Sequence, residues 1–185
     1  MRCTKENLLE DENLQDLLCE NVFIYPTDTI YGLGCDATND VLVKKIREIK
    51  ERDERPFSII APSKEWIREH CIIPDEGEEW LARLPGPFTL ILKLKKPELA
   101  AVTTGIGTIG VRIPHNWFSA IVADLGFPVV TTSVNRSGEP HMTSLADLPP
   151  RIERQVALVI DDGPLLGRPS TIVRLDLDEV EIISR

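Results

Sequence analysis

Short apolar runs rich in β-branched residues alternate with amphipathic stretches along this chain, and the irregularity of that alternation most constrains its fold. Strand-like composition is found in residues 22–25, 57–61, 88–94, 108–113, 128–134, 158–161, 171–175 and 180–184. The even βαβ rhythm of a doubly wound sheet is missing. The pattern therefore predicts an α/β (α+β) protein, a single domain over residues 1–185 in which helices pack on a twisted, mixed sheet. Residues 88–94 and 108–113 are expected to form a hairpin-like pair.

Helix starts are marked by capping residues. Thr4 can cap a first helix that is interrupted near residues 11–13, and Asn39 or Asp40 can cap a second one. In this second helix, apolar residues recur on one side, which indicates a stripe packed against a sheet. Further short helices are predicted at residues 64–70, 76–84 and 117–125. Residues 27–34 are predicted to be a loop whose two glycines bring the backbone close to a ligand.

Composition narrows the class of protein. A chain of 185 residues is long enough for one domain with its own core. Its four cysteines are widely spaced, without a C-x-x-C pair, so we expect reduced thiols and neither disulfides nor a bound metal. The first twenty residues lack the apolar centre of a signal peptide, and no apolar run is long enough to cross a bilayer. We therefore predict a cytoplasmic protein that does not bind membranes.

Two short polar segments stand out. Lys50-Glu51-Arg52 ends a predicted helix, and Ser133-Val134-Asn135 ends a predicted strand. Cations at a helix end commonly do no more than complement the helix dipole, and a polar strand end is commonly just a turn. Alternate residues of an extended segment point to the same side, however, so Ser133 and Asn135 can act together. If both segments converge, two solvent-facing cations and two neutral groups make a cradle for a polyphosphate, locally positive in a chain of net charge −9.

Other polar residues allow two interpretations each. Arg112 lies in an otherwise apolar strand, so it must be paired or face a ligand, and the sequence leaves both open. The hydroxyls of Thr27, Thr29 and Tyr31 can bond their own backbone in a glycine-bearing turn, or line a site. The three histidines have no metal-binding spacing. No G-x-x-x-x-G-K-[ST] loop is present, so any nucleotide site is not a P-loop.

These segments share an order with a known family. The chain carries Tyr25-Pro26-Thr27-Asp28-Thr29-Ile30-Tyr31-Gly32-Leu33-Gly34, then the K-x-R segment followed by Arg55-Pro56-Phe57-Ser58, then Gly110-Val111-Arg112-Ile113-Pro114, the S-x-N segment and Ser170-Thr171-Ile172-Val173. Together they resemble the YrdC-type threonylcarbamoyl-AMP synthase family from about Val22 to Arg185. The resemblance implies the YrdC-like fold, which agrees with the mixed sheet predicted above. Because this chain stops at Arg185, we do not expect the additional C-terminal domain that some relatives carry.

The resemblance also assigns residues to ligands. It places Lys50, Arg52, Ser133 and Asn135 on the phosphates of ATP as the catalytic group. It places Ser170 and Arg185 around the adenine and ribose. For the threonine site it implies Thr27, Thr29, Tyr31, Arg112 and Thr131. Arg55 departs from the lysine or asparagine expected at its position, and its role stays open.

The activity implied by the resemblance is synthesis of threonylcarbamoyl-AMP and pyrophosphate from L-threonine, bicarbonate or carbon dioxide, and ATP. Mg²⁺ is expected to accompany ATP, and the product would pass to a downstream tRNA threonylcarbamoyl-transferase complex. Two alternatives come from relatives: a module that binds double-stranded RNA or tRNA, and a YciO-like protein with weak nucleotide hydrolysis. The net acidic composition argues against RNA binding as the main activity, because that activity draws on a broad cationic face.

Overall fold

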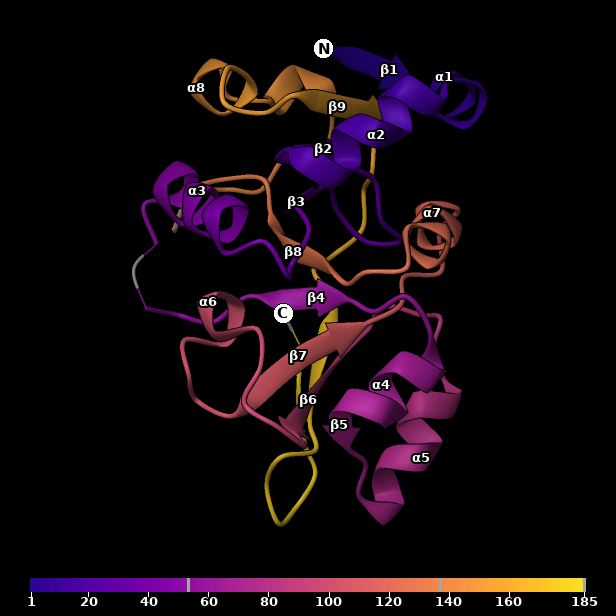
Figure 1. Cartoon of the computed structure of the whole chain (residues 1–185), viewed down its shortest axis with the longest axis vertical. Coiled ribbons are helices and arrows are strands. Elements are labelled where there is room, and N and C mark those ends of the chain that lie inside the picture. Colours follow the sequence, from indigo (N-terminus) through magenta and orange to yellow (C-terminus); the bar gives the residue numbers. More distant parts are fainter. Residues whose placement is uncertain (53, 137, 185) are drawn as a thin grey trace.

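The sheet runs through the whole molecule. The computed structural model describes residues 1–52, 54–136 and 138–184. Its strands follow the order β1-β9-β2-β3-β8-β4-β7-β6-β10-β11, and β5 pairs with β6 beside this path. In Figure 1 the paired strands are stacked along the long axis, with α3 and α6 at one side and α4, α5 and α7 at the other.

The elements are short. The strands are β1 (Arg2–Thr4), β2 (Phe23–Tyr25), β3 (Gly32–Gly34), β4 (Ser58–Ile60), β5 (Cys71–Ile72), β6 (Phe88–Leu94), β7 (Thr108–Arg112), β8 (Val129–Ser133), β9 (Leu158–Asp161), β10 (Thr171–Arg174) and β11 (Glu181–Ile183). The helices are α1 (Lys5–Glu10), α2 (Glu12–Glu20), α3 (Asp40–Lys50), α4 (Lys64–His70), α5 (Asp75–Ala82), α6 (Ala100–Thr103), α7 (Phe118–Leu125) and α8 (Pro150–Glu153), with a 3₁₀ turn, η1 (Leu145–Asp147).

The sheet is mixed, as predicted. Strand β9 is parallel to both β1 and β2, and β4 is parallel to β7. Antiparallel pairing joins β2 to β3, β3 to β8, and β8 to β4. The expected pairing of residues 88–94 with 108–113 is confirmed, because β6 and β7 are antiparallel neighbours. Parallel and antiparallel pairs within one sheet explain why the sequence lacks an even βαβ rhythm.

Local sequence explains where the helices begin and end. The Thr4 hydroxyl accepts from the Asn7 amide to start α1, and Asp11 interrupts the first helix and caps α2. The Asn39 side chain accepts from two backbone amides at the start of α3. That helix ends at Glu51, whose φ of 49° is left-handed and turns the chain away from the helix axis.

Alternation along the strands separates two hydrophobic clusters. Phe23 and Tyr25 of β2 point to one face of the sheet, and Ile24 points to the other. On the first face, the rings of Tyr25 and Phe118 of α7 stack with centroids 4.6 Å apart. On the second, Ile24 belongs to the cluster that buries the apolar stripe of α3. The sheet is therefore covered on both faces.

The loop predicted at residues 27–34 ends in a strand, which corrects the prediction. Gly32 and Gly34 lie in β3, and Tyr25 of the neighbouring strand packs across them. A Cβ atom on Gly32 would lie 2.5 Å from the Tyr25 ring, and one on Gly34 would lie 2.4 Å from the Val130 carbonyl oxygen. Internal packing therefore requires both glycines, which the prediction did not foresee, and Gly32 also lines the cavity described below.

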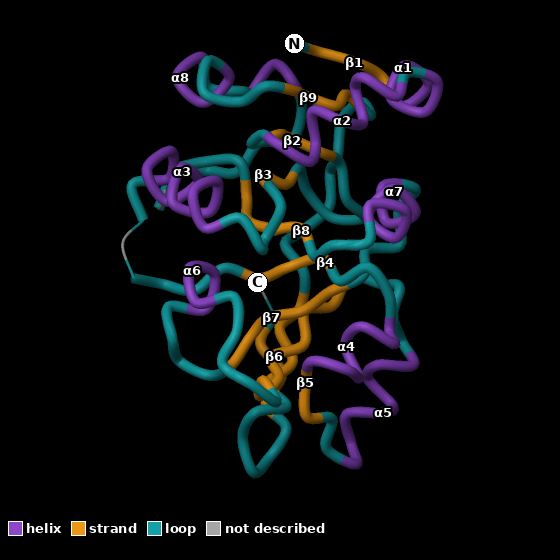
Figure 2. Tube along the Cα trace, in the orientation of Figure 1, coloured by secondary structure: helices purple, strands orange, loops and turns teal. Residues whose placement is uncertain are grey.

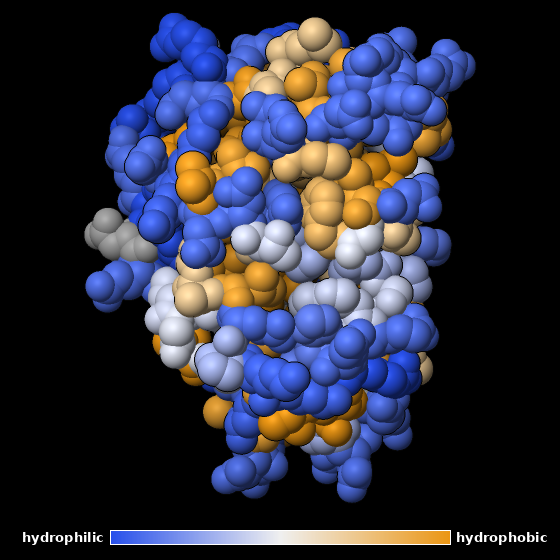
Figure 3. All heavy atoms as spheres, in the orientation of Figure 1, coloured by the Kyte–Doolittle hydropathy of each residue, from blue (hydrophilic) through white to orange (hydrophobic). Residues whose placement is uncertain are grey.

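The cysteines, one connecting loop and the surface complete the description of the fold. All four cysteines lie in the described part of the chain and are free, as predicted, and burial raises the pKa of the Cys71 thiol to about 12. Figure 2 shows the connection from α3 to β4 as a loop that passes α6. On the face seen in Figure 3, apolar residues appear in several separate areas among hydrophilic ones. Among the described helices, none combines the length and the apolar character needed to cross a bilayer.

Candidate functional site

One cavity collects most of the polar residues singled out in the sequence. Its volume is about 310 Å³, and loops and strand ends from several parts of the chain surround it. It is lined by Thr27, Ile30, Tyr31, Gly32, Arg52, Pro56, Phe57, Ser58, Thr89, Arg112, Thr131, Thr132, Ser133, Asn135, His141, Pro169 and Ser170. The strands β3, β8, β4, β7 and β6 lie side by side in the sheet, so their polar residues reach the same space.

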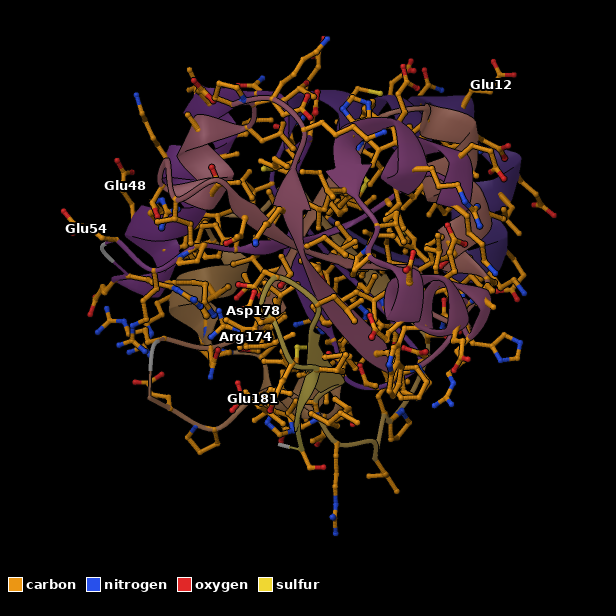
Figure 4. All side chains as sticks on the ribbon, turned by 90° about the horizontal axis from the view of Figure 1, so that it is seen from below. Glu12, Glu48, Glu54, Arg174, Asp178 and Glu181 are labelled. Carbon is orange, nitrogen blue, oxygen red and sulfur yellow. The ribbon has the colours of Figure 1, made fainter. Side chains whose placement is uncertain are left out.

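The cavity carries positive charge in an acidic molecule. Its lining includes the guanidinium groups of Arg52 and Arg112, and none of its described lining residues is Asp or Glu. One carboxylate, that of Asp28, pairs with Arg112 beside the lining and offsets part of this charge. Other acidic side chains lie farther away. Figure 4 shows Glu48 and Glu54 pointing outward at the edge of the molecule, and Asp178 and Glu181 near Arg174 on the hairpin of β10 and β11. The charge of Arg52 therefore attracts an anion to the cavity.

Arg52 is held at the cavity wall by contacts that include Phe57 and Pro56. Its guanidinium carbon lies 5.1 Å from the centroid of the Phe57 ring, and Nη2 donates to the Pro56 carbonyl oxygen at 2.8 Å. Arg47 lies over the same ring at 4.5 Å and donates to the Ala101 carbonyl oxygen at 2.6 Å. These contacts fix the direction of a planar cation, which suits two-point contact with phosphate.

Ser133 and Asn135 lie on the same side of the chain, as alternation predicts. Ser133 Oγ donates to Asn135 Oδ1 at 2.6 Å, and Asn135 Nδ2 donates to the Glu139 carbonyl oxygen at 2.5 Å. Both residues line the cavity. Much of their hydrogen-bonding capacity is therefore used within the segment that they shape.

Lys50 corrects one prediction. It was expected to face solvent beside Arg52, but only 1% of it is exposed and it does not line the cavity. Its Nζ donates to the carbonyl oxygens of Ser133 (2.5 Å) and Asn135 (2.9 Å) and to Asn135 Oδ1 (2.8 Å). Burial, and then the charge of Arg52, lower its pKa to about 7. The reason is positional: the last turn of α3 directs Lys50 under the S-x-N segment.

Arg112 combines the two interpretations that the sequence left open. Its Nη2 lies 2.5 Å from Asp28 Oδ1 in an almost fully buried ion pair, and Asp28 Oδ2 accepts from the His115 amide at 2.8 Å. Both terminal nitrogens also reach Thr29 Oγ1, at 3.4 Å and 3.3 Å. Arg112 nevertheless lines the cavity, and its buried Nε has no partner among the described residues. Thr29 does not line the cavity and supports Arg112 from behind.

The remaining residues predicted for the threonine site have different roles. Thr27 Oγ1 donates to the Ile30 carbonyl oxygen at 2.7 Å, so it closes its own turn while lining the cavity. Tyr31 also lines it, but its hydroxyl donates to the Gly163 carbonyl oxygen at 2.6 Å, and burial raises its pKa to about 12. Thr131 lies on the cavity wall in β8.

At the predicted adenine side, Ser170 lines the cavity and lies 2.7 Å from Thr89 Oγ1. Arg185, the other residue predicted there, lies outside the described residues. Strand β11 does pair with β10, and Ile183 lies opposite Ile172. Sequence reasoning missed Thr89, which no local motif marks, since only the parallel pairing of β6 with β10 brings it beside Ser170. His141 also lines the cavity.

A family model described as "Telomere recombination" and named for Sua5, YciO and YrdC matches residues 16–185. The chain belongs to the Sua5/YciO/YrdC family. It is 33% identical to a putative threonylcarbamoyl-AMP synthase of Methanocaldococcus jannaschii, over 90% of this chain and 80% of that protein. It is 34% identical to the threonylcarbamoyl-AMP synthase of Bacillus subtilis, over 91% of this chain.

The fold is that of solved family members. The crystal structure of P. abyssi Sua5 complexed with L-threonine matches with a TM-score of 0.85 and 26% identity, over 98% of this chain and 56% of that one. The single mixed α/β domain predicted from the sequence is thereby confirmed as the family's fold. The chain spans about half the length of the B. subtilis and P. abyssi proteins, at 51% and 56%.

Proposed function

We propose that this protein is an L-threonylcarbamoyladenylate synthase, a nucleotidyltransferase that uses L-threonine, bicarbonate or carbon dioxide, and ATP. One observation carries the proposal: Arg52, Ser133 and Asn135 line the same cavity as Arg112 and Thr27. Relatives named threonylcarbamoyl-AMP synthase, and a structural relative that binds L-threonine, support this choice of substrates.

The cavity suggests how the substrates are placed. Arg52 and the S-x-N segment hold the phosphates, and Ser170 contacts the nucleoside side. The guanidinium group of Arg112 lines the cavity and is oriented by its ion pair with Asp28, so it binds the substrate carboxylate. Thr27 and Thr131 complete the threonine side.

The reaction requires the two substrates to be positioned and does not require a nucleophilic side chain, because the carbamate itself is the nucleophile. The threonine amine adds to carbon dioxide, loses a proton and becomes a carbamate. A carbamate oxygen attacks the α-phosphorus of ATP, the bond to the bridging oxygen breaks, and pyrophosphate leaves. Arg52 stabilises charge that develops on the phosphates, while the cavity holds the two reactants in line.

Mg²⁺ fits this site as a companion of the nucleotide. The cavity lining offers hydroxyls but no carboxylate among its described residues, and the described part of the chain has no group of three His, Cys, Asp or Glu that could hold a metal. Phosphate oxygens and water would therefore supply most Mg²⁺ ligands, which is common for this ion. The ion would neutralise phosphate charge. We further propose that the product is used to modify tRNA by a partner enzyme.

The decisive experiment incubates the protein with ATP, L-threonine and bicarbonate, and detects threonylcarbamoyl-AMP by mass spectrometry together with pyrophosphate. We expect product only when all three substrates are present. Serine is expected to be poorer by about 10- to 200-fold, since it lacks one methyl group. ATP hydrolysis that is equal with and without threonine would instead favour the YciO-like alternative, and RNA binding without turnover would favour the RNA-binding one.

A further inference from the structure

Lys50 has a buried ammonium group that takes no part in the chemistry proposed above. Lys50 ends α3, and its Nζ reaches three oxygens of the segment that follows β8. Two are backbone carbonyl oxygens, of Ser133 and Asn135, and one is the side-chain oxygen Oδ1 of Asn135. An ammonium group has three donors, so this contact set uses all of them.

Such an arrangement is expensive to maintain. Moving a charge out of water costs free energy that only good hydrogen bonds offset, and a buried lysine without partners would be strongly unfavourable. Here the compensating acceptors all belong to one short segment. The bonds therefore fix the course of that segment and not only the position of the lysine side chain.

Each contact acts on a group that shapes the cavity. The acceptor Asn135 Oδ1 also receives the Ser133 hydroxyl at 2.6 Å, so Lys50 and Ser133 share it. On its other side, Asn135 Nδ2 donates to the Glu139 carbonyl oxygen at 2.5 Å and so fastens the turn that follows. A second tie joins the same two parts of the chain, because Glu51 and Arg136 form an ion pair at 2.5 Å.

We propose that Lys50 is a positioning residue: it acts on the nucleotide through the Ser133–Asn135 segment, which it holds in place from beneath the cavity, and not by touching the phosphates. The expected effect on ATP binding rests on the proposed function. The structural part of the inference does not depend on that function, since the hydrogen bonds of Lys50 form without a ligand. The two parts can therefore be tested separately.

The structural part is tested by hydrogen exchange on the protein without nucleotide. In Lys50→Met, peptides from Ser133 to Met142 should exchange at least about tenfold faster than in the wild type, because three hydrogen bonds to a charged donor are lost. Peptides of β6 should exchange unchanged. Lys44→Met is the matched control, since Lys44 is an exposed residue of the same helix. Unchanged exchange around Ser133 in Lys50→Met would overturn the proposal.

A second variant separates hydrogen bonding from charge. Lys50→Gln is neutral but keeps two donors that can reach the same carbonyl oxygens. If Lys50 positions the segment, Lys50→Gln should keep exchange and ATP affinity closer to the wild type than Lys50→Met does. If its charge acts directly on phosphate, the two variants should lose ATP affinity equally, which would overturn the proposal. Lys50→Gln also gives the exchange comparison if Lys50→Met does not fold.

The functional part is tested by a double-mutant cycle on the Kd for ATP, measured by calorimetry. Lys50→Met and Asn135→Ala should each weaken binding by about tenfold or more, and the double variant by little more than the worse single one. A double loss equal to the product of the single losses would show independent action and would contradict the proposal. If the wild-type protein forms no product but Lys50→Met still shows faster hydrogen exchange, the synthase assignment is wrong and the positioning role of Lys50 remains.

Discussion

Arg112 and Asp28 form a buried ion pair, with Nη2 and Oδ1 2.5 Å apart, at the wall of the candidate site. The partners come from β7 and from the loop after β2, so the pair connects two distant parts of the sheet. Because Asp28 also accepts from the His115 amide, the carboxylate orients Arg112 and anchors the next loop.

Breaking this pair should be costly. Asp28→Ala leaves the buried Arg112 charge without its partner, so we expect the free energy of unfolding to fall by about 3–5 kcal/mol, measured by chemical denaturation. Threonine binding should weaken too, because Arg112 loses its orientation. Asp124→Ala, at an exposed acidic residue of α7, is the control and should change stability by less than about 0.5 kcal/mol. A small effect of Asp28→Ala would show that the pair is not a structural support.

Arg52 should matter for turnover more than for folding. Arg52→Ala is expected to lower kcat/KM for ATP by about a hundredfold or more, since one well-placed charge commonly contributes that much to a transition state. Arg52→Lys should recover only part of the loss, because lysine cannot stack on Phe57 as a planar group. Arg154→Ala removes an exposed arginine and serves as control. Wild-type turnover in Arg52→Ala would show that the phosphate site lies elsewhere.

The pH dependence of ATP binding should depend on Lys50, whose pKa is lowered to about 7 by burial and by Arg52. The ammonium form supplies all three donors that hold the Ser133–Asn135 segment, so the Kd for ATP should increase as pH rises above about 7, by up to about tenfold per pH unit. Titration calorimetry from about pH 6 to about pH 9 measures this. Lys50→Met should lack this dependence, and an equal slope in both proteins would contradict the assignment.

Without nucleotide, the free energy of unfolding should rise as the pH rises, whereas the affinity for ATP falls. The unfolded chain holds the Lys50 proton more tightly, with an ordinary pKa of 10.5, than the folded chain does. Between about pH 7 and pH 10.5 the unfolded state therefore binds more protons, and stability should rise with pH. The difference between the unfolding free energies of the wild type and Lys50→Met isolates this contribution. A difference that does not vary over this range would contradict the lowered pKa.

Gly32 should not tolerate a side chain. In Gly32→Ala the new methyl group would lie 2.5 Å from the Tyr25 ring, so we expect a loss of about 1–3 kcal/mol in unfolding free energy. The penalty should be smaller in a Tyr25→Leu background, where the ring is gone. Equal penalties in both backgrounds, measured as a double-mutant cycle, would mean that the ring is not what excludes the methyl group.

The sequence predicted elements well where a local signal was strong. The caps at Thr4 and Asn39 follow from residues within a few positions of one another, and the pairing of β6 with β7 follows from two β-rich runs that are consecutive along the predicted strands. It missed β1, β5, α6 and α8, because elements of a few residues have no measurable periodicity. It placed β3 in a loop, because the glycines that mark a loop were required by a tyrosine on the neighbouring strand.

For the site, residue types in the sequence determined which chemistry is available: cations at Arg52 and Arg112, hydroxyls and an amide at Ser133 and Asn135, and no P-loop. Only the tertiary structure decided how they are used. Lys50 and Arg52 are two residues apart, yet one is buried under the S-x-N segment and the other lines the cavity. The physical reason is that burial and hydrogen-bond partners depend on which strands become neighbours in the sheet, and that pairing joins residues about eighty positions apart in the chain.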